Sequence, residues 1–377
     1  MKAFLAPAPG LPLPDSTGVS VIRVLGLSLY GPQAASHRVR LAQFQPGLAA
    51  AGIDLQIESL LDDAYLQRTY SGRRPSLRSL LAAYGRRLKA LRQAKHFDLA
   101  IVYAELLPFL PAWLERQLLP IPFLYDCDDA FFLKVRSGRL RLLQPLPGGK
   151  IHCLMAAAEA VTAGNTALAA YARRFNSTVT VLPSVVNTDL FCPAPPAPAK
   201  SSGGPFTVGW IGSPSTAPYL QLLVEPLELL ARERSVRLLV IGGPAPAIAG
   251  VEVIEQPWSL EQEVPLIQQF DLGVMPLPDT PWTRGKCAYK LIQCMACAIP
   301  VLASRVGANV EAVPAECGFL VESPAEWLAA FRKLAADPAL RARLGAAGRQ
   351  WVEKRYSLRS ALPVLGGVIR QAAGIAG

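Results

Sequence analysis

Residues 282–304 read W-T-R-G-K-C-A-Y-K-L-I-Q-C-M-A-C-A-I-P-V-L-A-S, and this stretch decides the fold. It predicts a helix from about Ala288 to Ala298 that leads directly into a buried strand at Val301–Ala303. A helix joined this closely to an apolar strand is typical of sheets in which strands and helices alternate. Cys294 and Cys297 fall on the same helix as C-M-A-C, without companion ligands nearby, so we expect them to pack in the core and not to bind zinc.

Two lysines mark the start of this helix as an anion site. Lys286 and Lys290 stand four residues apart and Gln293 three further on, so a helix that begins near Lys286 would carry all three on one face. Lysines are normally favoured at the C-terminal end of a helix, because the helix dipole is positive at the N-terminus. Their position therefore favours a bound diphosphate, the alternative being a solvated cationic face.

The same strand-and-helix pattern extends in both directions from this stretch, which predicts a parallel α/β architecture. The further predicted strands are Val21–Ser28, Ile53–Ser59, Leu99–Tyr103, Phe123–Tyr125, Val179–Leu182, Thr207–Ile211, Arg237–Ile241 and Leu272–Val274. One further helix is predicted to start near Ala34 and another to end near Ala163–Gly164. The other predicted helices span Ala167–Phe175, Tyr219 to about Arg234, Ala325–Ala336, Pro338–Trp351 and roughly Ala361–Ala373.

A proline-rich segment divides the chain into two domains. Residues 193–205 are rich in proline, alanine, serine and glycine, which favours neither helix nor strand. We therefore expect Rossmann-like, doubly wound domains over residues 21–192 and 206–355. Residues 1–20, with four prolines, are expected to form a flexible leader, and 356–377 a final helix that crosses back to the first domain.

Composition excludes several classes of protein. The 377 residues are 51% hydrophobic and 18% charged, which is typical of a globular protein and excludes a disordered or coiled-coil one. No apolar run is long enough to span a membrane and no secretion signal is evident, while seven scattered cysteines indicate reduced thiols, so we expect a cytoplasmic protein. No dinucleotide fingerprint, Walker loop, zinc-protease helix or hydrolase elbow is present.

Glycine-rich loops follow two predicted strands of the second domain. Gly212-Ser213 comes after Thr207–Ile211, and Gly242-Gly243 comes after Arg237–Ile241. Such loops let the backbone approach a phosphate and offer N–H groups to it, although glycine is common after strands in α/β proteins. Trp258 and Trp282 are candidates to stack on a sugar or a base, or else pack in the core.

The net charge of +10 is concentrated between Arg68 and Lys95, where nine basic residues occur without an acid. Leucines and a tyrosine at helical spacing predict an apolar stripe on the same helix, formed by Leu77, Leu80, Leu81, Tyr84, Leu88 and Leu91. One interpretation is a core-packed helix with a solvated basic face. The other is a surface for anionic lipid headgroups or an acidic acceptor, while nucleic acid is disfavoured because no binding motif accompanies the charges.

Five segments together resemble glycosyltransferase family 4, a group of two-domain GT-B sugar transferases. They are G-K-C-A-Y-K-L-I-Q-C-M-A-C-A-I-P-V-L-A-S-R-V-G-A-N from Gly285, S-H-R-V-R at Ser36–Arg40, Y-D-C-D-D-A at Tyr125–Ala130, V-L-P-S-V-V-N-T-D at Val181–Asp189, and G-W-I-G-S-P-S-T at Gly209–Thr216. The resemblance covers about residues 21–360 and is specific for the superfamily, not for a sugar.

This resemblance implies a retaining transfer from a nucleotide-diphosphate sugar, without a metal or other cofactor, to a glycan, lipid-linked or other envelope acceptor. The donor would lie in the second domain and the acceptor in the first, with the reaction in the cleft. Lys286 and Lys290 would neutralise the diphosphate, and Arg38 would be the phosphate-facing basic residue of the first domain. The donor-side residues would be Gly212, Ser213, Gly242, Gly243, Pro278, Lys286, Lys290 and Gln293, and the acceptor-side residues Ser36, His37, Asp126 and Asp129.

The chain departs from the family pattern at two positions. Gln293 stands where most members have the second glutamate of an E-x7-E pair, usually a ribose ligand, and Gly285 stands where they have the first. A glutamine amide still accepts a hydroxyl hydrogen bond. The departures also motivate an alternative function, a non-catalytic subunit that binds a nucleotide sugar or a glycan.

The segment D-C-D-D from Asp126 supplies a further catalytic candidate. Asp128 lies six residues after Pro122, near the place where many family members have a histidine beside the transferred sugar, so we expect Asp128 near that sugar. The same letters resemble the D-x-D metal motif of the GT-A fold. A helix N-cap cluster is the remaining interpretation, and we expect no metal because the lysine pair supplies the positive charge.

Overall fold

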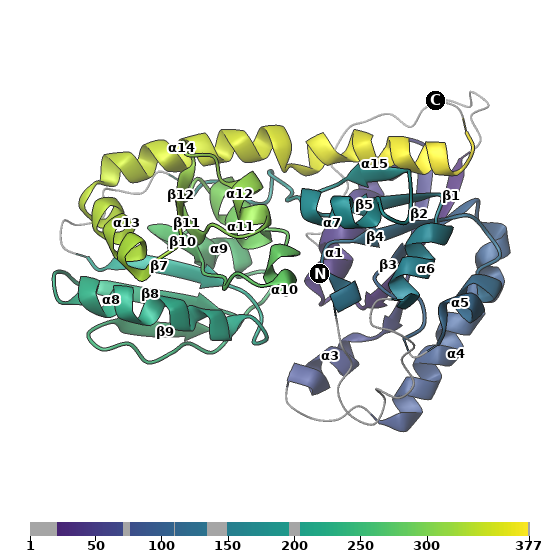
Figure 1. Ribbon diagram of the computed structural model, residues 1–377, viewed down its shortest axis with the longest axis horizontal. Coiled ribbons are helices and arrows are strands. Elements are labelled where there is room, and N and C mark those ends of the chain that lie inside the picture. Colours follow the sequence, from purple (N-terminus) through teal and green to yellow (C-terminus); the bar gives the residue numbers. More distant parts are fainter. Residues whose placement is uncertain (1–20, 71–75, 109, 134–148, 196–203, 376–377) are drawn as a thin grey trace. The chain divides into compact units, whose positions relative to one another are not determined.

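The computed structural model describes residues 21–70, 76–108, 110–133, 149–195 and 204–375. Within them the chain forms two compact units, each built on a six-stranded sheet whose paired strands are all parallel (Figure 1). The first unit contains the chain up to Ala163, Leu168–Leu182 and the residues from Leu362 onward. The second contains Gly164–Ala167 and Pro183–Ala361. The predicted α/β fold class is confirmed.

The sheet of the first unit has the strand order β2-β1-β3-β4-β5-β6. Because β1 lies between β2 and β3, the direction of winding reverses between β1 and β3, and ligands of such sheets bind at the carboxyl ends of the strands beside this point. The strands are β1 (Ile22–Tyr30), β2 (Ile53–Leu61), β3 (Leu99–Tyr103), β4 (Phe123–Cys127), β5 (Ala160–Ala163) and β6 (Val179–Val181).

In the described residues the first unit contains six α-helices, and two more are shared with the second unit. The six are α1 (Ala35–Arg40), α2 (Gln45–Ala50), α3 (Asp63–Tyr70), α4 (Leu77–Gln93), α5 (Ala112–Leu118) and α6 (Gly149–Ala157), and the shared two are α7 (Thr166–Ala172) and α15 (Leu358–Ala372). Arg370 of α15 donates to the Ala51 carbonyl at 2.7 Å, and Leu362 fills the space beside Gly47. The last helix is therefore part of the packing of α2.

The sheet of the second unit has the order β12-β11-β10-β7-β8-β9, and its winding reverses between β7 and β10. Its strands are β7 (Phe206–Ile211), β8 (Val236–Ile241), β9 (Glu252–Gln256), β10 (Leu272–Met275), β11 (Val301–Ser304) and β12 (Gly318–Val321). The carboxyl ends of β7 and β10 thus flank the place where open α/β sheets bind ligands.

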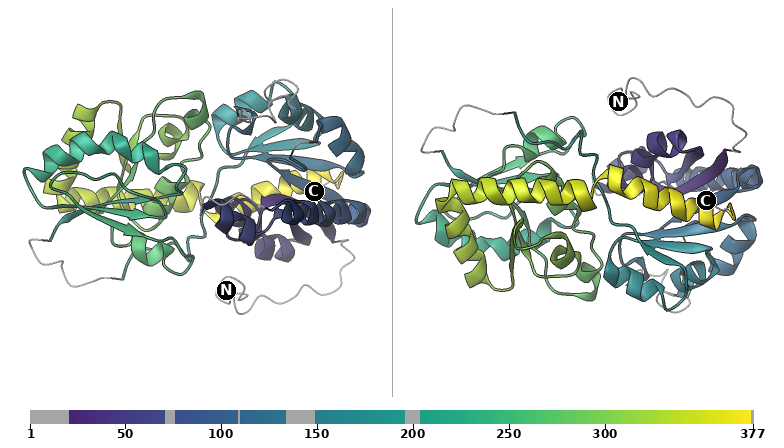
Figure 2. Two further views of the ribbon diagram at one scale, coloured as in Figure 1. Left: turned by 90° about the horizontal axis from the view of Figure 1, so that it is seen from below. Right: turned by 90° about the horizontal axis from the view of Figure 1, so that it is seen from above.

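Helices cover both faces of this second sheet (Figure 2). Side chains of β8 alternate between two apolar clusters: Leu238 and Val240 pack in one, Leu239 and Ile241 in the other, as expected for a strand buried on both faces. The helices are α8 (Val224–Ala231), α9 (Glu263–Ile267), α10 (Pro281–Arg284), α11 (Tyr289–Ala296), α12 (Ala308–Ala312), α13 (Pro324–Ala336) and α14 (Pro338–Arg355). A 3-10 segment over Ala217–Leu223 precedes α8.

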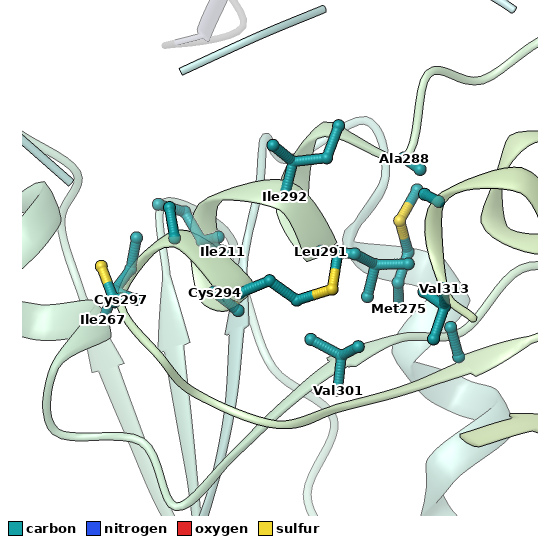
Figure 3. Packing of buried hydrophobic residues seen from close by; sticks show 14 of the residues in the cluster. Ile211, Ile267, Met275, Ala288, Leu291, Ile292, Cys294, Cys297, Val301 and Val313 are labelled. Carbon is teal, nitrogen blue, oxygen red and sulfur yellow. The ribbon is translucent and has the colours of Figure 1, made fainter. Parts of the chain in front are cut away.

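Figure 3 shows the cluster beneath α11, where Leu291, Cys294, Met275 and Val301 pack together. Cys294 and Cys297 are buried, and burial raises the pKa of both thiols, that of Cys297 to about 12. The expectation that these cysteines pack in the core is confirmed.

One predicted helix was wrong at its end, and three strands were missed. The helix expected to end near Ala163–Gly164 ends at Ala157, and Ala160–Ala163 forms β5. The alanine-rich sequence favours a helix, but these four residues are fully enclosed between β4 and β6, so sheet pairing overrides propensity. The other two missed strands, β9 and β12, are short edge strands, and β9 has no fully buried side chain, which weakens its apolar signal.

Three sequence predictions lie wholly or partly outside the described residues. The leader at 1–20 is outside them, as are positions 196–203 of the linker predicted at 193–205. Arg73 and Arg74 of the basic stretch also lie outside. These predictions remain predictions.

Candidate functional site

The glycine loops of the second unit bring β7 and β8 close together instead of offering their first N–H groups to a ligand. Gly212 donates its N–H to the Ile241 carbonyl and Gly242 donates to the Gln256 carbonyl, both at 2.9 Å. Gly242 has φ +83°, and an added Cβ would lie 2.4 Å from the Gly212 carbonyl oxygen. The expectation that these two N–H groups face a phosphate is therefore wrong in this structure, because the sheet already uses them.

The remaining members of the loops lie beside the same strand ends. A Cβ added to Gly243 would contact Ala217 and Trp210, so this glycine also serves close packing. The Ser213 hydroxyl lies 2.8 Å from the Ser215 hydroxyl. Both Ser213 and Gly243 are half-buried, so they remain accessible at the edge of the sheet.

The helix that follows the lysines begins later than predicted. Ala288, with φ +54°, precedes α11, which starts at Tyr289. Lys286 therefore lies in the loop between α10 and α11 and not on the helix, so the predicted shared helical face of Lys286, Lys290 and Gln293 is wrong. The left-handed residue breaks the helix because its dihedral angles do not continue the helical hydrogen-bond pattern.

Both lysines are nevertheless half-buried and lie over indole rings. The Lys290 Nζ is 5.5 Å from the centroid of Trp210, and the Lys286 Nζ is 4.5 Å from that of Trp282. A Cβ added to Gly212 would lie 2.7 Å from the Lys290 Cε, so this side chain extends across the loop after β7. Lys290 is also the second residue of α11, where the positive end of the helix dipole adds to its charge.

The loop after β10 is tied down by its own hydrogen bonds. The Pro278 carbonyl accepts from the Thr283 hydroxyl, and Thr280 and Thr283 form a reciprocal cap at the start of α10. Arg284 pairs with Asp279 through two bonds of 2.6 and 2.8 Å. Pro278 thus holds a rigid turn at the carboxyl end of β10, while Gly285 ends α10 with ordinary dihedral angles.

Gln293 binds a carboxylate that the sequence analysis did not single out. Its Nε2 donates to Glu263 Oε1 at 2.8 Å, and the Trp258 Nε1 donates to the same oxygen at 3.1 Å. Gln293 and Glu263 are both buried. Glu263 lies in a polar segment with two nearby acids of similar appearance, so no sequence signal marks it; only the packing of α9 against α11 brings it to Gln293.

In the first unit, Asp126 has a structural role. Arg40 forms two bonds to its carboxylate, with Nε to Oδ2 at 2.9 Å, and Thr162 donates to Oδ1. Arg40 also donates to the Leu182 carbonyl at 2.8 Å. This buried network joins α1 to the ends of β4, β5 and β6, and it occupies the oxygens that the sequence analysis assigned to an acceptor.

Asp128 differs from Asp126 because its side chain is half-buried and not fully enclosed. The Tyr103 hydroxyl donates to Asp128 Oδ1 at 2.6 Å. Burial and the neighbouring Asp129 raise the pKa of Asp128 to about 6, against the effects of Arg40 and Tyr103. Such a carboxyl exchanges a proton near neutral pH, as a catalytic acid or base must. Asp129 is half-buried beside it.

The segment Ser36–Arg38 packs within the first unit. His37 is buried, and its Nδ1 lies 3.2 Å from the hydroxyls of both Ser28 and Ser59; burial lowers the pKa of the ring. Arg38 donates to the carbonyls of Pro32 and Gln33, at 3.0 and 2.6 Å. Ser36 and Arg38 are half-buried, whereas the His37 ring faces the interior.

A pocket of about 190 Å³ lies at the carboxyl ends of β1, β2 and β3 in the first unit. Ala104, which follows β3, has φ +63° there, a strained conformation of the kind that concentrates at functional sites. Phe131 packs edge-on against Tyr103, the partner of Asp128, at a centroid distance of 5.7 Å. The wall is aromatic and aliphatic, and includes Leu29, Tyr30, Leu60, Tyr65, Tyr84 and Phe131, with Glu105 as its charged member.

The basic helix α4 does not bury the predicted leucine stripe as a whole. Leu77 and Leu81 are 72% and 65% exposed, whereas Ala83, Ala90 and Leu91 are buried. Arg87 is also buried, donates to the Ser28 carbonyl and has its pKa lowered by burial to about 10. The basic face is therefore smaller than predicted, because one arginine is part of the interior and Arg86 lies 3.4 Å from Asp62.

No group of three or more His, Cys, Asp or Glu side chains in the described ranges is arranged to hold a metal ion. Within the same ranges, every helix is too short or too polar to cross a membrane.

Comparison with solved structures identifies the fold as GT-B, the two-domain glycosyltransferase fold. Sucrose-phosphate synthase from Thermosynechococcus elongatus is 18% identical, with 93% of this chain and 98% of that chain covered at a TM-score of 0.66. The Anabaena protein HepE in complex with UDP-glucose is 14% identical, with 93% and 100% covered at 0.66. A UDP-forming trehalose-phosphate synthase from Burkholderia xenovorans is 13% identical, with 94% and 100% covered at 0.61.

Part of the chain is also similar to a known sequence family. Residues 205–337 match the family of glycosyl transferases group 1. The match covers most of the second unit, including the glycine loops, Glu263, both lysines and Gln293. No curated protein sequence is significantly similar to the chain.

Proposed function

We propose that the protein is a retaining glycosyltransferase of family 4 that transfers a sugar from a nucleotide-diphosphate sugar to a glycan, lipid-linked or other envelope acceptor. In this proposal the second unit binds the donor, and Lys286 and Lys290 offset the charge that grows on the leaving diphosphate. The family match over residues 205–337 supports the donor assignment, and HepE, whose structure contains UDP-glucose, shares the fold.

A single observation carries this proposal: Lys290 extends over Gly212 at the carboxyl end of β7, beside the point where the sheet reverses its winding. Lys290 stands in the first turn of α11, where the helix dipole is also positive, so two sources of positive charge meet at this strand end. Such a place suits the phosphates of a bound diphosphate.

The alternative is a subunit that binds a nucleotide sugar or a glycan without turnover. It is favoured by Gly285 and Gln293, which replace both glutamates of the family pattern. Turnover separates the two functions, so the test is donor hydrolysis and transfer with a panel of UDP-, GDP- and dTDP-sugars. Nucleotide binding without turnover on any acceptor would favour the subunit, and absence of nucleotide binding would exclude both.

Lys290→Met tests the donor site directly. Removing a charged hydrogen bond to phosphate is expected to weaken nucleotide binding about 10- to 100-fold, measured by calorimetry. Lys333→Met is the matched control, because Lys333 also lies over an aromatic ring of the second unit, at 5.1 Å from Phe319, but on α13. Equal effects of the two variants would contradict the assignment of Lys290.

The proposed reaction needs no divalent cation, because the lysines and the dipole of α11 supply the positive charge. EDTA is therefore expected to leave the turnover rate unchanged. Activity that is lost with EDTA and restored by Mn²⁺ would overturn this part of the proposal.

For the first unit we propose acceptor binding at the aromatic pocket, with Asp128 as the polar group for the transferred sugar. Support comes from Phe131, which lines the pocket and packs on Tyr103, the partner of Asp128, and also from the strained Ala104 and the raised pKa of Asp128. We keep Arg38, Ser36 and Asp129 as candidates at this edge because they are half-buried.

We also propose that α4 holds the protein on an anionic membrane surface, the inner face of the membrane being the one expected for a cytoplasmic enzyme. Leu77 and Leu81 stand exposed beside the exposed cations Arg78, Lys89 and Arg92, a combination that suits lipid headgroups. Each basic residue near such a surface contributes about 1 kcal/mol, so salt should release the protein.

Co-sedimentation with anionic liposomes at low and high salt tests this membrane proposal. Changing Arg78, Lys89 and Arg92 to glutamate should abolish binding, and Leu77→Ser with Leu81→Ser should weaken it if the leucines insert. Arg87 is left unchanged because it is buried. Wild-type protein that stays in the supernatant at low salt would exclude the membrane and leave an acidic acceptor or a solvated face.

A further inference from the structure

Glu263 is the one charged side chain that is buried in the second unit, as far as the described residues extend. It begins α9 and is 8% exposed. Burying a carboxylate is costly unless hydrogen bonds replace its lost hydration. Its placement at the carboxyl end of the sheet therefore calls for a partner.

Two donors meet on one oxygen of this carboxylate. Gln293 Nε2 and Trp258 Nε1 both bond to Oε1, at 2.8 and 3.1 Å. No bond from a described residue reaches Oε2. Because an ionised carboxylate has about four acceptor sites, half of its capacity is available to a ligand.

A short chain of contacts places Glu263 in the same wall as the proposed phosphate site. Trp258 lies beside Gly242, since a Cβ added there would be 3.1 Å from the Trp258 Cβ. Gly242 in turn touches Gly212, which lies under Lys290. Gln293 follows Lys290 by three residues on α11, so about one helical turn separates the group that orients the carboxylate from the ammonium.

The pairing also explains why a glutamine suits position 293. A glutamate there would bring a second carboxylate within hydrogen-bond distance of Glu263, and two like charges at that distance repel. The amide of Gln293 instead donates to Glu263. The carboxylate at this site thus comes from α9 and not from α11.

Resting on the proposed function, we propose that Glu263, oriented by Gln293 and Trp258, accepts hydrogen bonds from the vicinal hydroxyls of the ribose of the donor nucleotide. A carboxylate next to a diphosphate site matches the ribose, because ribose is the diol joined directly to the first phosphate. The transferred sugar also carries vicinal hydroxyls, so the experiment separates these two sources.

The test measures binding of UDP and 2′-deoxy-UDP, and of GDP and 2′-deoxy-GDP, to the full chain by calorimetry. Wild type should bind the better ribonucleotide about tenfold or more tightly than its deoxy form, because the deoxy form loses one of the hydrogen bonds proposed to the buried carboxylate. Glu263→Gln should lose most of this preference by weakening the ribonucleotide and changing the deoxynucleotide little. Glu261→Gln, an exposed acid two residues away, is the matched control and should keep it.

A second variant guards against a folding effect of the first. Trp258→Phe keeps the carboxylate but removes one of its donors, so the ribose preference should shrink without vanishing, with thermal unfolding as the check on integrity. Equal binding of UDP and 2′-deoxy-UDP by wild type, or an unchanged preference in Glu263→Gln, would overturn the proposal while leaving the donor site intact. A Glu263→Gln defect seen only with sugar-bearing donors would reassign the carboxylate to the sugar. No binding of any nucleotide would overturn the proposed function itself.

Discussion

Each unit is built on its own six-stranded parallel sheet, but the two units differ in the kinds of side chain that they bury. Within the described residues the first unit buries five acidic, basic or histidine side chains: His37, Arg40, Arg87, Glu115 and Asp126. The second unit, apart from its cysteines, buries only Glu263 among such groups, and its two central clusters are apolar. The two sheets have similar topology, so topology does not dictate where charge is placed.

The difference shows two uses of a buried charge. Asp126 has both oxygens occupied by Arg40 and Thr162, so its charge organises the unit itself. Glu263 has two donors on a single oxygen and stands beside the lysine-bearing end of α11. A buried carboxylate with complete pairing indicates structure, and one with incomplete pairing at a strand end indicates a ligand.

The largest expected effect comes from breaking the ion pair of the first unit. Arg40→Met leaves Asp126 buried without its guanidinium and should lower the free energy of unfolding by about 3–5 kcal/mol, measured by urea denaturation. Arg40→Met combined with Asp126→Leu should recover much of this loss, because the unpaired charge is gone. Nucleotide affinity of the second unit should be unchanged in the double variant. A loss of less than 1 kcal/mol in the single variant would show that the pair is not structural.

A second prediction concerns pH and Glu115, whose pKa burial raises to about 7 against the opposing effect of Lys150 at 2.7 Å. An unfolded glutamate ionises near pH 4.5, so between about pH 4.5 and 7 the unfolded chain loses its proton while the folded chain keeps it. Stability of the first unit should therefore fall by up to about 3 kcal/mol as pH rises through this window and stay level above it.

Glu115→Gln should flatten this decline, followed as the urea midpoint between pH 4.5 and 8. Asp128, with its pKa raised to about 6, also lowers stability as pH rises. The urea midpoint of Glu115→Gln should therefore still fall slightly with pH, and Asp128→Asn is the companion variant that tests this remainder. A wild-type midpoint that rises over this range would contradict the prediction.

The smallest effect on stability is expected from a substitution of a loop glycine in the second unit. Gly242→Ala places a Cβ 2.4 Å from the Gly212 carbonyl oxygen at a φ of +83°, so it should cost about 1–3 kcal/mol and disturb the loops around Lys290. Gly85→Ala on α4, where a Cβ meets nothing within 4 Å, is the control and should be neutral or stabilising. Similar thermal unfolding of the two variants would contradict the close approach of the loops.

Much of the architecture could be predicted from the sequence, because strands buried on both faces leave continuous apolar runs. Leu99–Tyr103 was located with its bounds, whereas Ala160–Ala163 was missed because its alanines carry a helical preference that only the neighbours β4 and β6 override. Periodicity also placed Leu77 and Leu81 with the buried leucines of α4, although only the contact of that helix with β2 decides which side is covered.

The candidate site was less accessible to sequence reasoning. Lys290 and the glycines could be found from the sequence because lysine and glycine are the residue types expected at a phosphate site. The left-handed conformation of Ala288, which excludes Lys286 from the helix, could not be found because alanine rarely adopts it. Glu263 and Arg40 act through partners 30 and 86 residues away in the sequence, and such pairs exist only once the sheets have formed.

The course of α15 has a consequence for how the protein is made. Its residues from Leu362 onward complete the first unit by packing on Gly47 and bonding to Ala51, yet the ribosome adds them after the whole of the second unit. At about 5–20 residues per second, translation from Leu182 to Leu362 takes on the order of 10 to 40 s. During that interval the nascent first unit exposes the surface of α2 that the last helix will cover, and a chaperone could bind there. A chain truncated near residue 360 would contain the second unit but would lack the last helix of the first.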